Sequence, residues 1–149
     1  MAAAKVDTMI RGGRGVTATE VLDTSVAIRG GRIVALGHVE ALPPADRTID
    51  ATGKIVLPGL IDCHVHLGAV YDDWSTGPLA AAHAGLTTLI AFAEYNDGET
   101  LPQATKRVAD EASQASVLDF GFHFIVNNEP HILEGMPEAF EMGVTSFKI

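Results

Sequence analysis

Two histidines separated by a single residue are the clearest candidates for chemistry in this sequence. They lie in Asp62-Cys63-His64-Val65-His66, directly after a long apolar run. Residues two apart on a β-strand point to the same face, so both imidazoles can bind one divalent ion. Zn, Mn, Fe, Co and Ni all suit such a pair. We therefore predict a metal site at His64 and His66, with two unrelated histidines as the alternative.

A lysine in a second apolar segment is the next candidate. It lies in Ser146-Phe147-Lys148-Ile149, where a free ammonium is costly to bury. A neutral lysine amine can add CO2 to become a carbamate, an anion with two donor oxygens. Two dications about 3.5–4 Å apart need a bridging anion, and a carbamate supplies one. Lys148 is thus a candidate bridging ligand, and a lysine that reaches solvent or an acidic partner is the alternative.

Other polar residues are weaker candidates. His123 lies in an apolar strand, where a hydrogen-bonded core histidine is favoured over a ligand. Asp62 is expected either to orient a metal-bound histidine, because such histidines need partners, or to form hydrogen bonds at the end of the strand. Cys63 alternates with the two histidines, so we expect it to face the helices. The residues interpreted as ordinary loop or helix positions are His38, His83, His131, Asp72 and Asp73.

From Leu57 onward, strands and helices alternate. The expected strands are Gly59–His66, Thr87–Ala93, Val117–Val126 and Val144–Ile149, and the expected helices are Leu79–Ala84, Ala104–Ala115 and Glu138–Met142. This alternation predicts an α/β fold with a parallel sheet that is buried on both faces. Such a sheet is doubly wound or a (β/α)8 barrel, and a barrel typically takes about 250 residues. Because the sequence stops within an apolar run, we expect a truncated chain.

Residues 1–57 instead suggest short strands with tight turns, in an antiparallel β unit. The expected strands are Lys5–Ile10, Gly15–Val21, Thr24–Arg29, Arg32–Gly37, Arg47–Ala51 and Lys54–Leu57. Gly30-Gly31 is the strongest hairpin signal. The arginine–glycine segments at residues 11–15 and 29–32 are similar to RNA-binding boxes, but turns between strands are the favoured interpretation.

Composition narrows the classes of partner. The 149 residues carry 19 acidic and 10 basic side chains, a net charge of −9, which disfavours nucleic acids and anionic membranes. No apolar run reaches the roughly 18–20 residues of a membrane span, and no signal peptide is visible. Cys63 is the only cysteine, which predicts a reducing, cytoplasmic location.

Three ordered motifs together resemble the dihydropyrimidinase/hydantoinase branch of the amidohydrolase superfamily. Residues 56–66, which contain both histidines, resemble the first barrel strand of the superfamily. The segments at residues 72–77 and 81–88 resemble this branch, as does the carboxylated-lysine motif at residues 143–148. The N-terminal pattern is similar to the family's small β-sandwich domain, so the resemblance covers essentially the whole chain.

The resemblance implies the N-terminal portion of a (β/α)8 TIM-like barrel. About four βα units at residues 58–149 would follow a β-sandwich segment at residues 1–57. His64, His66 and carbamylated Lys148 would bind two divalent metal ions, with zinc favoured, and Lys148 would count as catalytic. A metal-bridging hydroxide would open a dihydropyrimidine or hydantoin ring, a cyclic amide or imide, to an N-carbamoyl amino acid. The implied assembly is a homotetramer, and the fragment alone is expected to be inactive.

The resemblance leaves the substrate open. The loop Leu67–Tyr71 is shorter than expected of hydantoinases, and it lacks the arginine that dihydroorotases and many allantoinases carry there. An allantoinase or a dihydroorotase-like enzyme is therefore an alternative. A non-catalytic scaffold homologue is the second alternative, and the presence of His64, His66 and Lys148 argues against it.

Overall fold

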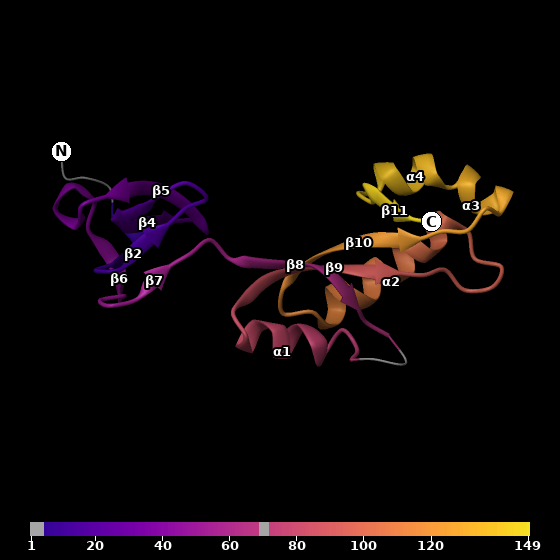
Figure 1. Cartoon of the computed structure of the whole chain (residues 1–149), viewed down its shortest axis with the longest axis horizontal. Helices are drawn as coiled ribbons and strands as arrows, with labels where there is room; N and C mark the ends of the chain where they lie inside the picture. Colours follow the sequence, from indigo (N-terminus) through magenta and orange to yellow (C-terminus); the bar gives the residue numbers. More distant parts are fainter. Residues whose placement is uncertain (1–4, 69–71) are drawn as a thin grey trace. The chain divides into compact units, whose positions relative to one another are not determined.

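The computed structural model describes residues 5–68 and 72–149. The chain forms two compact units, Met1–Pro58 and Gly59–Ile149. The first is built mainly of β-strands, and the second alternates strands with helices (Figure 1). Within the described ranges, no helix has both the length and the apolar character that crossing a bilayer requires.

The first unit contains two small sheets. Its elements are β1 Val6–Arg11, β2 Arg14–Val16, β3 Val21–Asp23, β4 Ser25–Arg29, β5 Arg32–Gly37, a 3-10 helix at Val39–Ala41, β6 Ala45–Asp50 and β7 Ile55–Val56. The strand orders are β5-β4-β1-β6 and β3-β2-β7. Val6, Met9 and Ala27 are buried together as the core of this unit.

The prediction of an antiparallel unit is wrong for two strand pairs. β1 pairs antiparallel with β4 but parallel with β6, and β2 pairs parallel with β7. A tight turn imposes antiparallel pairing only on strands that follow each other, and β2 to β5 intervene between β1 and β6. The predicted strand Gly15–Val21 is also divided, because a turn separates β2 from β3. In that turn the backbone N–H of Thr17 donates to the carbonyl of Glu20 at 2.9 Å.

Both arginine–glycine segments are turns, as predicted. Gly30 and Gly31 join β4 to β5 with φ angles of 56° and 72°, which residues with a side chain rarely adopt. The backbone N–H of Gly30 donates to the Asp7 carboxylate at 2.6 Å and ties the hairpin to β1. The other segment joins β1 to β2, and Gly12 there has a φ of 76°.

The second unit is a four-stranded parallel sheet with helices between its strands. Its elements are β8 Leu60–His66, α1 Gly77–His83, β9 Leu86–Ala93, α2 Leu101–Ala115, β10 Asp119–Ile125, α3 Pro130–Glu134, α4 Met136–Glu141 and β11 Ser146–Lys148. The strand order β11-β10-β9-β8 follows the chain, and every neighbouring pair is parallel. The predicted α/β alternation and the parallel sheet are confirmed, but the expected burial of both faces is not, because six of the seven residues of β8 are exposed.

Local signals explain where the helices begin. The Thr100 side chain accepts from the Gln103 backbone N–H, and the Gln103 side chain accepts from the Thr100 backbone N–H, which completes the predicted capping box. Because Thr100 is the N-cap, α2 begins at Leu101, three residues before the predicted start. The short helix α3 was not predicted, although Pro130 occupies its first turn.

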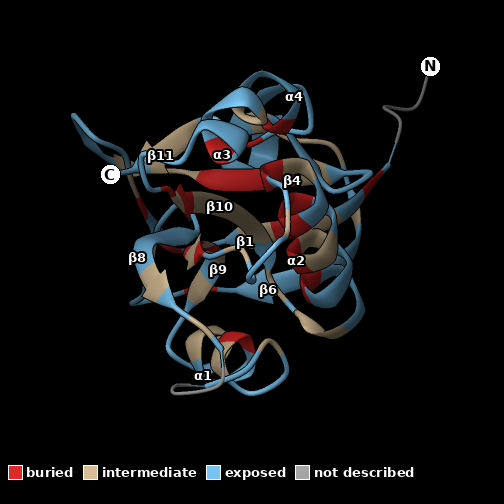
Figure 2. Ribbon diagram, turned by 90° about the vertical axis from the view of Figure 1, so that its right-hand side faces the viewer, coloured by how far each residue is buried: buried red, intermediate tan, exposed pale blue. Residues whose placement is uncertain are grey.

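The core of the second unit lies between the sheet and helices α2, α3 and α4. Its buried members are Ala93, Leu101, Ala104, Val108, Phe124, Val126, Ile132, Ala139 and Val144. Figure 2 marks buried stretches in red, and they include parts of α2 and α3. On β9 the side chains of Leu89, Ala91 and Ala93 are buried, and the residues between them belong to the other face of the sheet.

Candidate functional site

The strand that carries the two histidines contains a β-bulge. Asp62 pairs with Leu89 and Val65 pairs with Ala91, so three steps along β8 match two steps along β9. Extra residues of this kind re-aim side chains next to functional sites. The bulge breaks the simple alternation from which Cys63 was predicted to pack against the helices. Cys63 is exposed, so that prediction is wrong.

Both imidazoles nevertheless lie on one side of the sheet, because they contact the same ring. The ring centres of His64 and His66 lie 4.7 and 4.9 Å from the ring centre of Phe92. They lie 5.6 Å from each other. The predicted shared face is therefore present, and Phe92 on β9 forms its floor.

The strand register extends this face across the sheet. His66 pairs with Phe92, Phe92 pairs with His123, and His123 pairs with Ser146. Paired residues in adjacent strands point to the same face. Lys148 lies two residues after Ser146 and therefore shares it. This face is opposite to the one on which Phe124 is buried against the helices.

Lys148 reaches the same aromatic ring as the histidines. Its Nζ lies 4.5 Å from the ring centre of Phe92, in cation–π geometry. β8 and β11 are the two edge strands of the sheet, with β9 and β10 between them. Contacts from both edges to one ring mean that the sheet curves around Phe92. The curvature brings together His64, His66 and Lys148, the three residues that the sequence singled out.

His123 is hydrogen-bonded, as the sequence predicted, but it also belongs to this face. Its Nδ1 contacts the hydroxyl of Ser146, and its Nε2 lies 3.2 Å from the carbonyl oxygen of Cys63. Its ring centre lies 5.2 Å from that of Phe92. The sequence identified neither Phe92 nor Ser146. The available signal was the alternation along Leu86–Ala93, which assigns Phe92 to the face opposite the buried alanines.

Asp62 supports the backbone of the bulge. Its carboxylate accepts the backbone N–H of His64 at 3.0 Å. Of the two roles expected for Asp62, this backbone bond fits hydrogen bonding within the strand.

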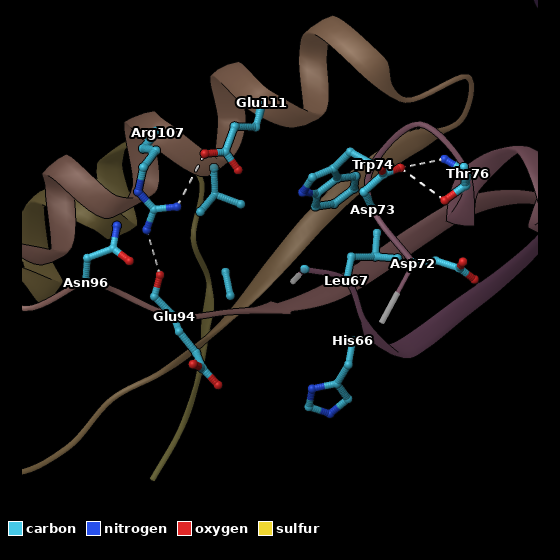
Figure 3. Close-up of a pocket in the computed structure, with 13 residues that line it drawn as sticks. His66, Leu67, Asp72, Asp73, Trp74, Thr76, Glu94, Asn96, Arg107 and Glu111 are labelled. Carbon is cyan, nitrogen blue, oxygen red and sulfur yellow. Dashed lines mark hydrogen bonds and ion pairs between the residues drawn. The ribbon is translucent and has the colours of Figure 1, made fainter. Parts of the chain in front are cut away.

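A pocket of about 800 Å³ opens beside His66, at the carboxyl ends of β8 and β9. Figure 3 shows His66 on the far side of this pocket from Arg107. Arg107 donates to the Glu99 carboxylate at 2.8 and 2.9 Å and to the carbonyl of Glu94 at 3.0 Å. The Arg107 guanidinium lowers the pKa of Glu99 by hydrogen bonding, and Glu99 in turn raises the pKa of Arg107. The donors of Arg107 are thus engaged in holding this wall of the pocket.

Asp73, which follows β8, holds together the turn before α1. One oxygen of Asp73 accepts hydrogen bonds from the backbone and hydroxyl of both Ser75 and Thr76, at 2.6 to 3.0 Å. These bonds, with the Ser75 hydroxyl first, lower the pKa of Asp73 to about 2. Asp72 is exposed and lines the pocket. The loop Leu67–Tyr71, considered above for its length, falls partly outside the described residues.

The donor set fits a metal ion in part. With metal–nitrogen bonds of about 2.0–2.1 Å, two imidazoles on one ion have ring centres within roughly 6.5 Å of each other. The separation of 5.6 Å between His64 and His66 meets this limit. Residues 5–68 and 72–149 contain no group of three or more His, Cys, Asp or Glu side chains that could hold a metal. The chain therefore offers two imidazoles and one lysine amine, which is an incomplete shell.

Comparison with known proteins relates the chain to one group of enzymes. No family model matches the sequence. A D-hydantoinase from Geobacillus stearothermophilus is 37% identical over 95% of this chain and 31% of its own length. An allantoinase from Enterococcus faecalis is 31% identical over 97% of this chain and 33% of its own length.

Solved structures agree with the sequence matches. The crystal structure of a dihydropyrimidinase from Brevibacillus agri superimposes with a TM-score of 0.87 at 35% identity, over 95% of this chain and 32% of the other. The chain spans about a third of the length of the curated relatives it matches. Over nearly all of its residues, the chain is therefore similar to part of proteins named D-hydantoinase, dihydropyrimidinase and allantoinase.

Proposed function

We propose that this chain is part of a metal-dependent hydrolase that opens cyclic amides. The observation that carries the proposal is the convergence of His64, His66 and Lys148 on Phe92, from opposite edges of one sheet. The three side chains are the ones that metal chemistry requires, and the relatives named hydantoinase and allantoinase act on rings that contain amide bonds. In this proposal the four parallel strands are the first half of a (β/α)8 barrel, and the first unit belongs to a β-sandwich domain.

Each residue has a separate role in the proposed site. His64 and His66 hold one divalent ion through their imidazole nitrogens. Lys148 forms no salt bridge with any residue in the described part of the chain, so its amine is available to react with CO2. That reaction forms an N–C bond and releases one proton, which leaves an anionic carbamate that can bridge two ions. Divalent ions bound there would act as Lewis acids toward a carbonyl oxygen and lower the pKa of a water molecule.

The net reaction of the proposed enzyme is hydrolysis of one ring amide. Water adds its oxygen to the carbonyl carbon, the ring C–N bond breaks, and the released nitrogen takes up a proton. A hydantoin or dihydropyrimidine ring gives an N-carbamoyl amino acid in this way. Because the relatives are about three times as long as this chain, we place the remaining metal ligands and the acid–base group beyond Ile149.

Metal analysis of the intact protein tests this proposal. Native mass spectrometry of the wild type should detect two divalent ions and one CO2 adduct per chain, together with the state of assembly, for which the family resemblance implies a tetramer. His64→Ala should lose metal, because a ligand is removed, whereas His83→Ala, on the exposed end of α1, should retain it. Hydrolysis of hydantoin and dihydrouracil should follow metal content. A metal-free wild type, or a fully loaded His64→Ala variant, would contradict the assignment.

Allantoin is the second substrate to test, because an allantoinase is 31% identical to this chain. The same preparation should be assayed with hydantoin, dihydrouracil and allantoin at equal concentrations. A preference for allantoin, in kcat/KM, would reassign the ring substrate and leave the proposed metal site unchanged.

A further inference from the structure

His123 connects the two strands that carry the candidate ligands. It lies on β10, and its two ring nitrogens contact groups on different strands, the Cys63 carbonyl on β8 and the Ser146 hydroxyl on β11. Cys63 immediately precedes His64, and Ser146 lies two residues before Lys148. A single imidazole therefore spans from the bulge that presents one candidate ligand to the strand that presents another.

The chemistry of these contacts fixes the proton on the ring. A carbonyl oxygen can only accept, so Nε2 of His123 must carry a hydrogen to bond with Cys63. The Ser146 hydroxyl beside Nδ1 can both donate and accept, so that contact is satisfied in either direction. Together the two contacts require a hydrogen on Nε2 of His123.

Both ends of this connection lie where the observed strand pairing is short or interrupted. On β8 the bulge interrupts the pairing with β9 next to His64. β11 has three residues, which pair with His123, Phe124 and Ile125 of β10. Pairing with these neighbours alone constrains both segments weakly. The imidazole of His123 supplies a side-chain link at each of them.

We propose that His123 is a positioning residue, which holds the His64 bulge and the Lys148 strand in register with each other. It binds no metal and contacts no substrate in this proposal. The consequence for metal binding rests on the proposed function, whereas the positioning of the two strands does not. Orienting partners of metal ligands typically contribute about 10–100-fold in metal affinity.

The first test needs no metal. Nitrogen-15 spectra of the metal-free protein should show a hydrogen on Nε2 of His123. In His123→Phe, which keeps a ring but removes both hydrogen bonds, amide hydrogen exchange at His64 and Lys148 should accelerate, while exchange in α2 stays unchanged. Ser146→Ala should accelerate exchange at Lys148 more than at His64. An Nδ1–H tautomer, or unchanged exchange in folded His123→Phe, would overturn the proposal.

The second test measures metal binding by competition with a chelator. His123→Phe should lose about 10–100-fold in affinity. His123→Gln retains a donor for the Cys63 carbonyl and should recover part of that loss. His83→Phe, an exposed histidine in α1, is the matched control and should bind as the wild type does. If the wild type binds no metal, the proposed function is wrong, but the hydrogen-exchange result still stands. If His123→Phe binds metal with the same affinity as the wild type, His123 has no positioning role at the metal site.

Discussion

Phe92 is the residue around which the candidate ligands assemble. His64, His66, His123 and the amine of Lys148 all lie within about 5 Å of its ring centre. Its side chain offers an apolar surface that fixes the orientation of several polar groups without competing for a metal ion. The ring also explains how an amine can lie on this face although no acid in the described part of the chain forms a salt bridge with it, because the face of an aromatic ring attracts cations.

A substitution that keeps the volume of Phe92 but removes the ring tests this role. Phe92→Leu should strengthen metal binding by about two- to fivefold, since the cation–π contact contributes about 0.5–1 kcal/mol to the metal-free ammonium form of Lys148 and is absent from the proposed carbamate. Phe140→Leu, at an exposed position on α4, is the matched control. Chelator competition reports the affinity, and a melting curve verifies that the fold is intact. Unchanged affinity in Phe92→Leu would show that the ring only fills space.

The residues that bear unusual chemistry could be found in the sequence, whereas their support could not. Two histidines at strand spacing and a lysine in an apolar run are rare enough to be noticed. Phe92 and Ser146 have the same types as ordinary strand residues. The alternation along β9 assigns Phe92 to a face, but the three-dimensional register is needed to place both residues beside the candidate ligands. The hydrogen bonds of His123 join β8, β10 and β11, and no spacing along the chain predicts such a contact.

At the scale of elements, capping and turn signals were reliable because they act between near neighbours. The Thr100 capping box and the Gly30-Gly31 hairpin are both present. The bulge in β8 and the parallel pairing of β1 with β6 were not predicted. Each depends on a partner strand distant in the sequence, so local patterns carry no information about it.

The turn before α1 makes a pH-dependent contribution to stability through Asp73. Its hydrogen bonds lower its pKa from 3.8 to about 2. The unfolded chain therefore binds more protons between these values, and the stabilisation is complete above pH 3.8 and is lost as the pH falls toward 2. Asp73→Asn should lower the free energy of unfolding at neutral pH, and its difference from the wild type should shrink in acid.

Denaturant unfolding at a series of pH values measures this difference. Asp72→Asn, the exposed neighbour, is the matched control because its carboxylate lies outside the hydrogen bonds to Ser75 and Thr76. The free energy of unfolding of Asp73→Asn could instead lie below that of the wild type by the same amount at every pH from neutral to 2. In that case the effect would come from the introduced amide and not from the loss of the carboxylate charge.

At the scale of the whole molecule, the proposed site depends on curvature. Lys148 and the two histidines come from the edge strands of the sheet, so a flat sheet would keep them apart. The alternation of strands and helices predicted the parallel sheet but left its curvature undecided between a barrel and a doubly wound fold. The contacts that reach Phe92 from both edges show that the four described strands curl around one face.

Reconstitution of the intact protein tests whether the assembled site depends on CO2 as well as on metal. Apoprotein prepared in CO2-free buffer should regain little hydantoin hydrolysis with Zn²⁺ alone or with bicarbonate alone. Both together should restore activity and the mass of one CO2, because the bridging carbamate and the ions stabilise each other. Lys148→Ala should not respond to bicarbonate, whereas Lys106→Ala, in an exposed ion pair on α2, should respond fully. Full recovery with Zn²⁺ alone would exclude the carbamate and leave Lys148 as an unmodified amine above Phe92.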